Sequence, residues 1–282
     1  SYVSGASGMS AGQITVGDHP PSGPSPSVLA HESVTQGGEK HNLFTALPPL
    51  RGRRWLHPGS LPTQLAINVL DLDVTKNCNL RCTYCFKSDT VHPRAEAMSL
   101  EVAMTAVDWL IEASMGARAL NVNLIGGEPL LAWPMIEILV PYAKRRAAQF
   151  AKSVQFGTTT NLTLVNEQII EFSRRWGMGW HCSIDGTPEV QNVQRPGVGG
   201  APSAGRAERG ARLVLRVRPG ACARATVRPE NAAKIFQSLL YFEHLGFKNF
   251  AFAIAEENDW RAQQFAAWDQ QWGKIADYAI ER

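Results

Sequence analysis

Six strand-like segments alternate with helix-like segments between residues 66 and 255, and this alternation restricts the fold more than any other feature. The first strand is expected at 66–74, where apolar residues alternate with polar ones. The other strands are expected at 120–125, 154–160, 179–184, 222–227 and 249–255. Strands separated by helices form parallel sheets with right-handed crossovers. The pattern therefore predicts an α/β fold with its site at the carboxyl ends of the strands.

The helices between these strands carry recognisable end signals. Ser99 is a plausible N-cap for a helix over 99–113, and Gly177 ends a helix over 166–176. Asn231 is expected to cap a helix over 231–245 that Gly246 ends. The remaining helices are expected at 133–146, near 207–215 and at 259–282.

Composition divides the chain into three expected parts. Residues 1–62 form a Gly-, Ser- and Pro-rich segment and lead-in, which we expect to be flexible at its start. The barrel core is expected at 63–256, and a connector helix at 257–282. A hydrophobic fraction of 44% excludes a mainly disordered chain.

Charge and cysteine usage restrict partners and compartment. Lys and Arg number 28 against 25 Asp and Glu, so the net charge of +3 favours neither nucleic acid nor a membrane surface as a partner. No apolar run approaches the roughly 20 residues that span a bilayer. The five cysteines are clustered rather than spread as a disulfide framework, which indicates a reducing compartment and hence the cytoplasm.

Three cysteines fall within eight residues, in Cys78-Asn-Leu-Arg-Cys82-Thr-Tyr-Cys85, directly after the first expected strand. Thiolates suit zinc or an iron–sulfur cluster. Structural zinc normally takes four ligands, often as two distant pairs, and the sequence has no second pair. A four-iron cluster takes a ligand on each iron, so three cysteines leave one iron open for a small molecule. We favour such a cluster over structural zinc or a chance grouping.

This CxxxCxxC motif, after the first strand of a six-fold strand–helix repeat, resembles that of the radical S-adenosylmethionine (radical SAM) superfamily. Gly126-Gly127-Glu128-Pro129, at the end of the second strand, strengthens the resemblance. In that family the GGEP element binds the amino group of the methionine moiety, which needs acceptors and close backbone approach. The resemblance covers about residues 64–256 and implies an α/β fold, a partial (βα)6 barrel with parallel strands and helices outside.

Weaker matches imply further SAM contacts. Tyr84 is the aromatic residue that family members carry near adenine, and Asn161 belongs to a TN-like element after the third strand. Ser183 and Asp185 resemble the SxDG of a peptide- and protein-modifying subgroup, where the Ser hydroxyl contacts the ribose; ordinary turn chemistry is the alternative. Arg224, on the fifth strand, is a candidate partner for the methionine carboxylate. Three other arginines compete for that role: Arg195, Arg206 and Arg209.

The resemblance implies an enzyme with two cofactors, a 4Fe–4S cluster and S-adenosylmethionine (SAM), and with a one-electron donor such as flavodoxin or ferredoxin. Its branch carries a C-terminal SPASM or twitch domain and acts on a peptide or protein, as a peptide maturase or sulfatase maturase does. No cysteine follows Cys222, so we expect either that this cluster domain is absent or that the sequence stops before it. The alternatives are a radical SAM enzyme with a small-molecule substrate and a truncated iron–sulfur module without turnover.

Overall fold

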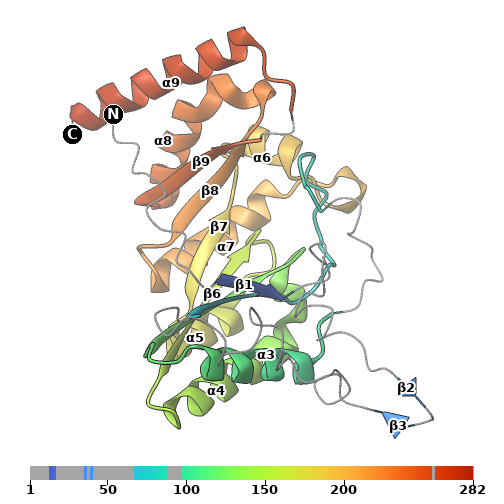
Figure 1. Cartoon of the computed structure of the whole chain (residues 1–282). Helices are drawn as coiled ribbons and strands as arrows, with labels where there is room; N and C mark the ends of the chain where they lie inside the picture. Colours follow the sequence, from blue (N-terminus) through green and yellow to red (C-terminus); the bar gives the residue numbers. More distant parts are fainter. Residues whose placement is uncertain are drawn as a thin grey trace. The chain divides into compact units, whose positions relative to one another are not determined.

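The computed structural model describes residues 67–87, 97–255 and 258–281, together with the backbone of three short strands at 13–16, 35–36 and 39–40. The chain divides into two compact units. The first unit comprises Ser1–Thr75 and Glu96–Gly157, and the second comprises Lys76–Ala95 and Thr158–Arg282. Figure 1 labels the helices and strands of both units.

The strands of the main sheet are hydrogen-bonded in the order β1-β4-β5-β6-β7-β8-β9. Their bounds are Gln13–Val16, Val69–Asp73, Ala119–Ile125, Ser153–Thr160, Gly179–Ser183, Cys222–Val227 and Asn249–Ile254. The six strands from β4 to β9 are those that the sequence predicts, and the predicted parallel α/β fold is confirmed. β1 was not expected; it pairs in parallel with β4. A separate antiparallel pair joins β2 (Thr35–Gln36) and β3 (Glu39–Lys40).

Helices alternate with these strands along the chain. The α-helices are α3 (Leu100–Ala113), α4 (Trp133–Ala148), α5 (Glu167–Trp176), α6 (Pro188–Gln194), α7 (Ala204–Val217), α8 (Ile235–Leu245) and α9 (Ala262–Ile280). Three short 3-10 turns are η2 (Pro129–Ala132), η3 (Val198–Gly200) and η4 (Pro229–Lys234). Apart from β1, β2 and β3, the predicted lead-in at 1–62 lies outside the described residues, and the predicted boundaries of the core and the connector stay predictions.

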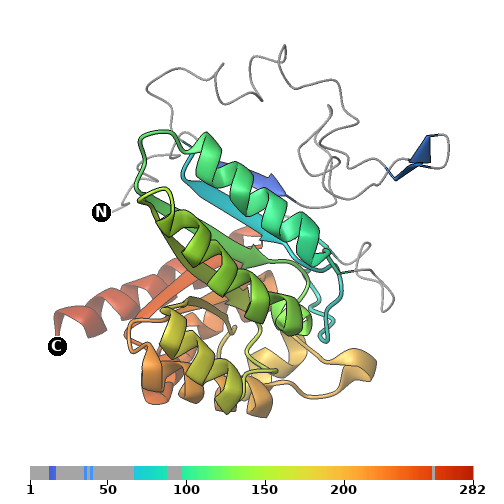
Figure 2. The same ribbon diagram turned by 90° about the horizontal axis from the view of Figure 1, so that it is seen from below.

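In the first unit, the two faces of the strands differ. Leu70 and Leu72 of β4 are fully buried, and α3 packs against this strand with α4 beside it. Figure 2 shows α3 and α4 running side by side along the strands. The intervening residues are polar: Asp71 lies opposite Asn123 of β5, whose Nδ2 donates to Asp71 Oδ1 at 2.7 Å. The apolar face is therefore the core beneath the helices, and the opposite face carries the polar side chains.

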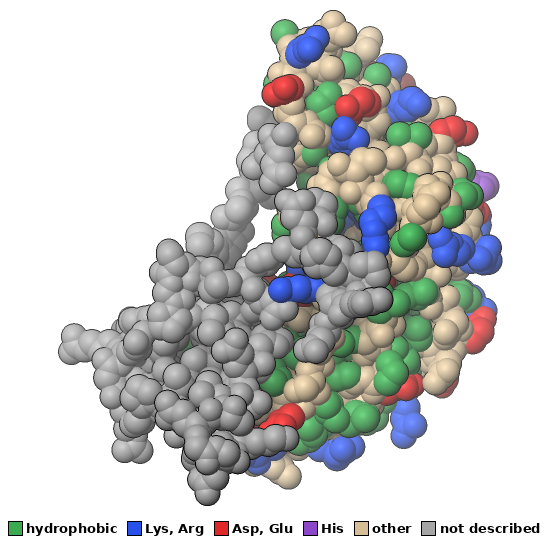
Figure 3. All heavy atoms as spheres, turned by 90° about the vertical axis from the view of Figure 1, so that its right-hand side faces the viewer, with side chains coloured by type: hydrophobic (Ala, Val, Ile, Leu, Met, Phe, Trp, Pro, Cys, Tyr) green, Lys and Arg blue, Asp and Glu red, His purple; other side chains and the backbone are tan. Residues whose placement is uncertain are grey.

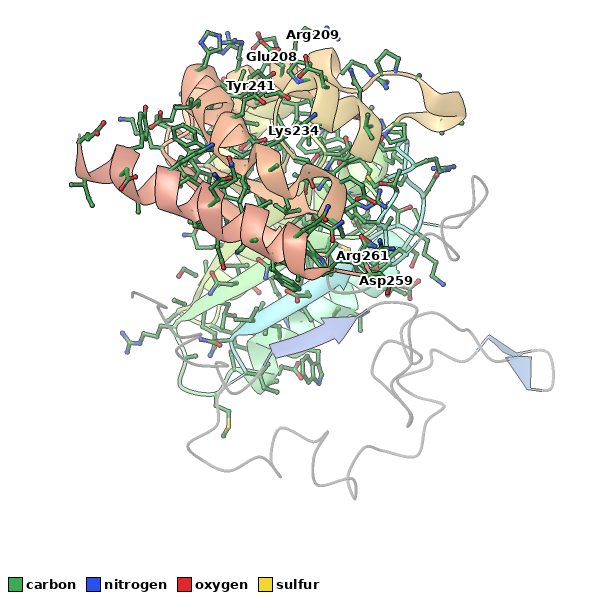
Figure 4. The ribbon with its side chains drawn as sticks, turned by 90° about the horizontal axis from the view of Figure 1, so that it is seen from above. Glu208, Arg209, Lys234, Tyr241, Asp259 and Arg261 are labelled. Atoms are coloured by element: carbon green, nitrogen blue, oxygen red, sulfur yellow. The ribbon has the colours of Figure 1, made fainter. Side chains whose placement is uncertain are left out.

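The second unit repeats this arrangement. Cys182 of β7 lies opposite Ala223 of β8, and both are buried completely. The helices α7 and α8 are joined through Glu208, whose Oε2 accepts a hydrogen bond from Tyr241 Oη at 3.1 Å. Figure 4 labels these two residues, which come from neighbouring helices. The helix-covered face of the strands is again the core.

Two helix predictions are corrected. The helix expected from Asn231 begins at Ile235, and η4 precedes it. Asn231 does not cap α8, because its Oδ1 accepts from the backbone N–H of Arg228 at 2.7 Å and holds the 3-10 turn. The last helix begins at Ala262 rather than at residue 259, since the backbone of Arg261 is extended. The seven-residue α6 was not predicted, because it is too short to show a helical period.

Within the described ranges, none of the helices combines the length and the apolar character that a bilayer crossing requires. The face drawn in Figure 3 carries basic and acidic side chains interspersed among apolar ones.

Candidate functional site

The cysteines lie on a loop, residues 78–85, that is held in place by backbone hydrogen bonds. The N–H of Arg81 donates to the carbonyl of Pro196 at 2.7 Å, and the N–H of Thr83 donates to that of Gln194 at 2.9 Å. Gln194 is the last residue of α6 and Pro196 lies just after it, so main-chain hydrogen bonds join this short helix to the loop.

All five cysteines lie in the described part of the chain, and none forms a disulfide. The three thiols of the loop are half-buried. The Sγ of Cys78 lies 3.4 Å from the N–H of Leu80 and 3.9 Å from the Nδ2 of Asn161. Among the described residues, no three His, Cys, Asp or Glu side chains are grouped closely enough to hold one metal ion. The donor set is three reduced sulfurs, which is the ligand chemistry of iron–sulfur clusters.

A buried charged network lies behind the loop. Asp185 is buried, and its Oδ2 accepts from Tyr84 Oη at 2.6 Å and from Gln194 Nε2 at 3.0 Å. Its Oδ1 accepts from the N–H of Thr226 at 3.0 Å. The Nε of Arg195 lies 3.0 Å from Asp185 Oδ2, as an ion pair rather than an aligned hydrogen bond. Both carboxylate oxygens are therefore occupied by donors of this chain.

This network sets the electrostatics of the cysteine loop. Burial raises the pKa of the Cys82 thiol to about 11, and the charge of Arg195 opposes that rise. Burial also raises the pKa of Tyr84 well above its usual value, again against the effect of Arg195. The guanidinium is thus the group that favours negative charge at this end of the loop.

The GGEP element belongs to the first unit, at the end of β5. Gly126 has a φ of +146°, and a Cβ placed on it would lie 2.4 Å from the carbonyl oxygen of Thr75. The N–H of Gly127 donates to that same carbonyl at 2.7 Å. Only glycine tolerates both the backbone conformation and the close approach. Glu128 is buried and accepts from the N–H of Leu130 at 3.1 Å, so its carboxylate begins η2.

Three other predicted site residues lie in the second unit. Asn161 donates from Nδ2 to Asn79 Oδ1 at 2.8 Å, so it holds the start of the cysteine loop. Ser183 and Arg224 are register partners on β7 and β8. They share one face at the carboxyl end of β7, where Arg224 is exposed and Ser183 half-buried.

The sequence alone does not identify Arg195 and Gln194 as the partners of Asp185. Arg195 was considered only as one of several arginines for the methionine carboxylate, and Gln194 was not considered. Both follow from α6, a helix that the sequence did not reveal. The sequence places Arg195 in the loop after Ser183-Ile184-Asp185-Gly186. That position does not specify the direction of its side chain.

The two isolated cysteines lie apart from the loop on the sequence and occupy strand positions. Cys182 is fully buried, and burial raises its pKa. Cys222 is half-buried and lies opposite His181 of β7. Their setting is that of small packed side chains.

A family model described as the Radical SAM superfamily matches residues 72–242. An uncharacterized protein of Methanocaldococcus jannaschii is 33% identical over 134 residues, which are 48% of this chain and 44% of that protein. The GTP 3′,8-cyclase of Chlorobaculum tepidum is 35% identical over 119 residues, covering 42% and 33% of the two chains. The cysteine-type anaerobic sulfatase-maturating enzyme of Clostridium novyi is 26% identical over 137 residues, covering 46% and 35%. The chain thus spans less than half the length of these relatives.

Two solved structures share the fold. The structure of anSMEcpe with bound AdoMet has a TM-score of 0.67 at 22% identity, covering 76% of this chain and 59% of that one. The structure of Streptococcus suis SuiB bound to precursor peptide SuiA has a TM-score of 0.57 at 15% identity, covering 77% and 47%. These likenesses bear on architecture, and they confirm the radical SAM type of partial barrel that the sequence predicts.

Proposed function

Because this chain belongs to the radical SAM superfamily, we propose that Cys78, Cys82 and Cys85 hold a 4Fe–4S cluster whose fourth iron takes SAM. When bound, these cofactors supply one-electron cleavage of SAM to methionine and a 5′-deoxyadenosyl radical, which removes a hydrogen atom from a substrate. One observation carries the assignment: three reduced, half-buried thiols lie on one loop, and main-chain bonds hold that loop in place.

The residues of this chain then bind and orient SAM. Gly126 and Gly127 let the backbone approach the methionine ammonium, and Glu128 supplies a carboxylate acceptor for it. Tyr84 is proposed to lie near the adenine. Its ring is held by the hydrogen bond from its hydroxyl to Asp185.

The remaining assignments differ in how far the geometry supports them. Ser183 and Arg224 share one face of adjacent strands, which supports joint contact with the ribose and the carboxylate. Asn161 is proposed to act through the cysteine loop that it holds. Asp185 was predicted to contact SAM, but its oxygens already take donors of this chain. We therefore assign Asp185 to positioning Tyr84 and Arg195.

A peptide or protein side chain is the proposed substrate. A sulfatase-maturating enzyme is among the relatives, and one structural neighbour is bound to a precursor peptide. The second candidate is a small molecule of the nucleotide class, because a GTP 3′,8-cyclase matches at 35% identity. A flavodoxin or ferredoxin is the proposed one-electron donor, and the cytoplasm is the proposed compartment.

Anaerobic reconstitution tests the cluster. We expect about four irons and four sulfides per chain, as for one cubane. Replacing any one of Cys78, Cys82 and Cys85 by Ala should abolish iron binding. The Cys182→Ala, Cys222→Ala double variant is the matched control, and it should keep the iron at a packing cost of about 1–2 kcal/mol. A stoichiometric zinc without iron or sulfide in the wild type would contradict the proposal.

The substrate class is tested with the same reconstituted protein. Dithionite and SAM should give 5′-deoxyadenosine, measured by chromatography, in the wild type and not in the loop variants. Unstructured cysteine- or serine-containing peptides are expected to raise that yield more than GTP does. A larger response to GTP would replace the peptide assignment by the nucleotide one.

A further inference from the structure

The geometry points to Arg195 as a fixed positive charge that faces a cluster ligand, and we propose that it positions Cys82 and makes the cluster easier to reduce. The inference rests on the proposed function, since it concerns a cluster on Cys82. It assigns Arg195 a role different from that of a partner for the methionine carboxylate.

Arg195 is directed at the cysteine loop from inside the second unit. Its side chain is 10% exposed, and its Nη1 lies 3.9 Å from the Sγ of Cys82. Its Cζ lies 5.4 Å from the centre of the Tyr84 ring, so the guanidinium contacts both the thiol and an aromatic ring. Such a contact favours a cation over the ring and leaves the N–H group directed at the sulfur.

The position of Arg195 is determined from two sides. Its backbone N–H donates to the carbonyl of Gln191 at 2.8 Å and ends α6. Its guanidinium is paired with Asp185, which in turn accepts from Tyr84 and Thr226. A move away from Asp185 would leave the buried guanidinium without a partner, which is unfavourable. The positive charge is therefore held beside the sulfur by contacts within the chain.

The two charges of this pair act unequally on Cys82. The guanidinium contacts the sulfur directly, with Nη1 3.9 Å from Sγ, whereas the Asp185 carboxylate pairs with the Nε of that same guanidinium. The carboxylate also accepts hydrogen bonds from three uncharged donors: Tyr84 Oη, Gln194 Nε2 and the N–H of Thr226. The net effect at the sulfur is stabilisation of negative charge.

Reduction of the cluster adds one electron from an external one-electron donor and breaks no bond. The cluster and its thiolates gain one negative charge in this step. A fixed positive charge in a low-dielectric site stabilises the more negative state, and the net charge and hydrogen bonds at the sulfurs set the potential of such clusters. Loss of the Arg195 charge should therefore make reduction harder, whereas loss of the Asp185 charge should make it easier.

The test is a dye-mediated redox titration of reconstituted protein, followed by electron paramagnetic resonance of the reduced cluster without SAM. We expect a more negative midpoint potential in Arg195→Gln and a value close to that of the wild type in Arg195→Lys, which keeps the charge. Arg209→Gln removes an exposed guanidinium from α7 and should leave the potential unchanged. Asp185→Asn should move the potential in the positive direction. A second readout is iron release to a chelator, which should be several-fold faster in Arg195→Gln.

Two outcomes overturn the inference: equal potentials in wild type and Arg195→Gln at equal iron content, or shifts of the same sign in Arg195→Gln and Asp185→Asn. If Arg195→Gln fails to fold by circular dichroism, the sign found in Asp185→Asn decides alone. A wild type that takes up no iron contradicts the proposed function instead, before Arg195 is tested.

Discussion

At the scale of single residues, polar side chains of the second unit hold the cysteine loop in place. In the first unit, glycines form a close turn. Gly126 is required by two independent facts, its positive φ and the 2.4 Å approach of a Cβ to the Thr75 carbonyl. That turn places Glu128 at the start of η2, where its side chain is buried.

Glu128→Gln tests this assignment without touching a cysteine. The amide keeps the size but loses the charge, and hydrogen bonds to charged groups are worth about 1.5–3 kcal/mol. SAM affinity should fall about tenfold or more, at about 1.4 kcal/mol per decade, while iron content stays that of the wild type. The measurement is equilibrium binding of SAM to the reconstituted proteins. Unchanged affinity in a folded, iron-loaded variant would detach the GGEP element from SAM recognition.

At the scale of elements, side-chain contacts join neighbouring helices on the outside of the second unit. Glu208 of α7 accepts from Arg212 one turn later at 2.8 Å and from Tyr241 of α8 at 3.1 Å. The hydrogen bond from Arg212 and that from Tyr241 lower the pKa of Glu208. Figure 4 shows Glu208 and Tyr241 close together at this helix pair.

The lowered pKa has a direct consequence for stability. A carboxyl whose folded-state pKa is depressed stabilises the fold above its unfolded pKa, about 4.3 for Glu, and that contribution is lost as the pH falls through the folded value. A double-mutant cycle of Glu208→Gln and Arg212→Gln should give a coupling of about 0.5 kcal/mol at pH 7, because the pair is partly exposed. Urea unfolding at pH 7 and near pH 3 measures it. A coupling of equal size at both pH values would rule out an ionic origin.

At the scale of the whole molecule, each unit has its own core, and that of the second unit extends to the last helix. Trp268 of α9 and Trp260 before it pack on a buried cluster of Val227, Ala232 and Ile235. The indole of Trp268 also meets that of Trp272 at a centroid distance of 5.7 Å. In this structure α9 is therefore part of the packing of the second unit.

Trp268→Ala should destabilise the protein for this reason. Removal of a largely buried indole costs about 3–5 kcal/mol, and since Trp268 is half-buried we expect a loss of about 2–3 kcal/mol. Thermal and urea unfolding followed by circular dichroism provide the measurement. Ile280→Ala, at an 82% exposed position near the end of the same helix, should change stability by less than about 0.5 kcal/mol. Equal effects of both substitutions would show that α9 does not contribute to the core.

The order of the strands and the cysteine loop could be predicted from residues taken in sequence. Alternation along a strand, the cap at Ser99 and the stop at Gly177 are local signals, because each depends on the backbone within one turn. The same holds for Gly126, where glycine itself records the conformation. The α/β fold and the family could therefore be recognised without coordinates.

The charged network behind the loop could not be predicted in this way. Asp185 and Tyr84 are 101 residues apart, and Arg195 and Cys82 are 113 apart. Nothing in their neighbours along the chain specifies that one carboxylate takes donors from three segments, or that the guanidinium turns toward a thiol. The short α6 was missed for another reason, because its seven residues are too few to show a helical period. Local backbone chemistry thus sets the elements, and burial of charge between distant segments sets the surroundings of the proposed cluster.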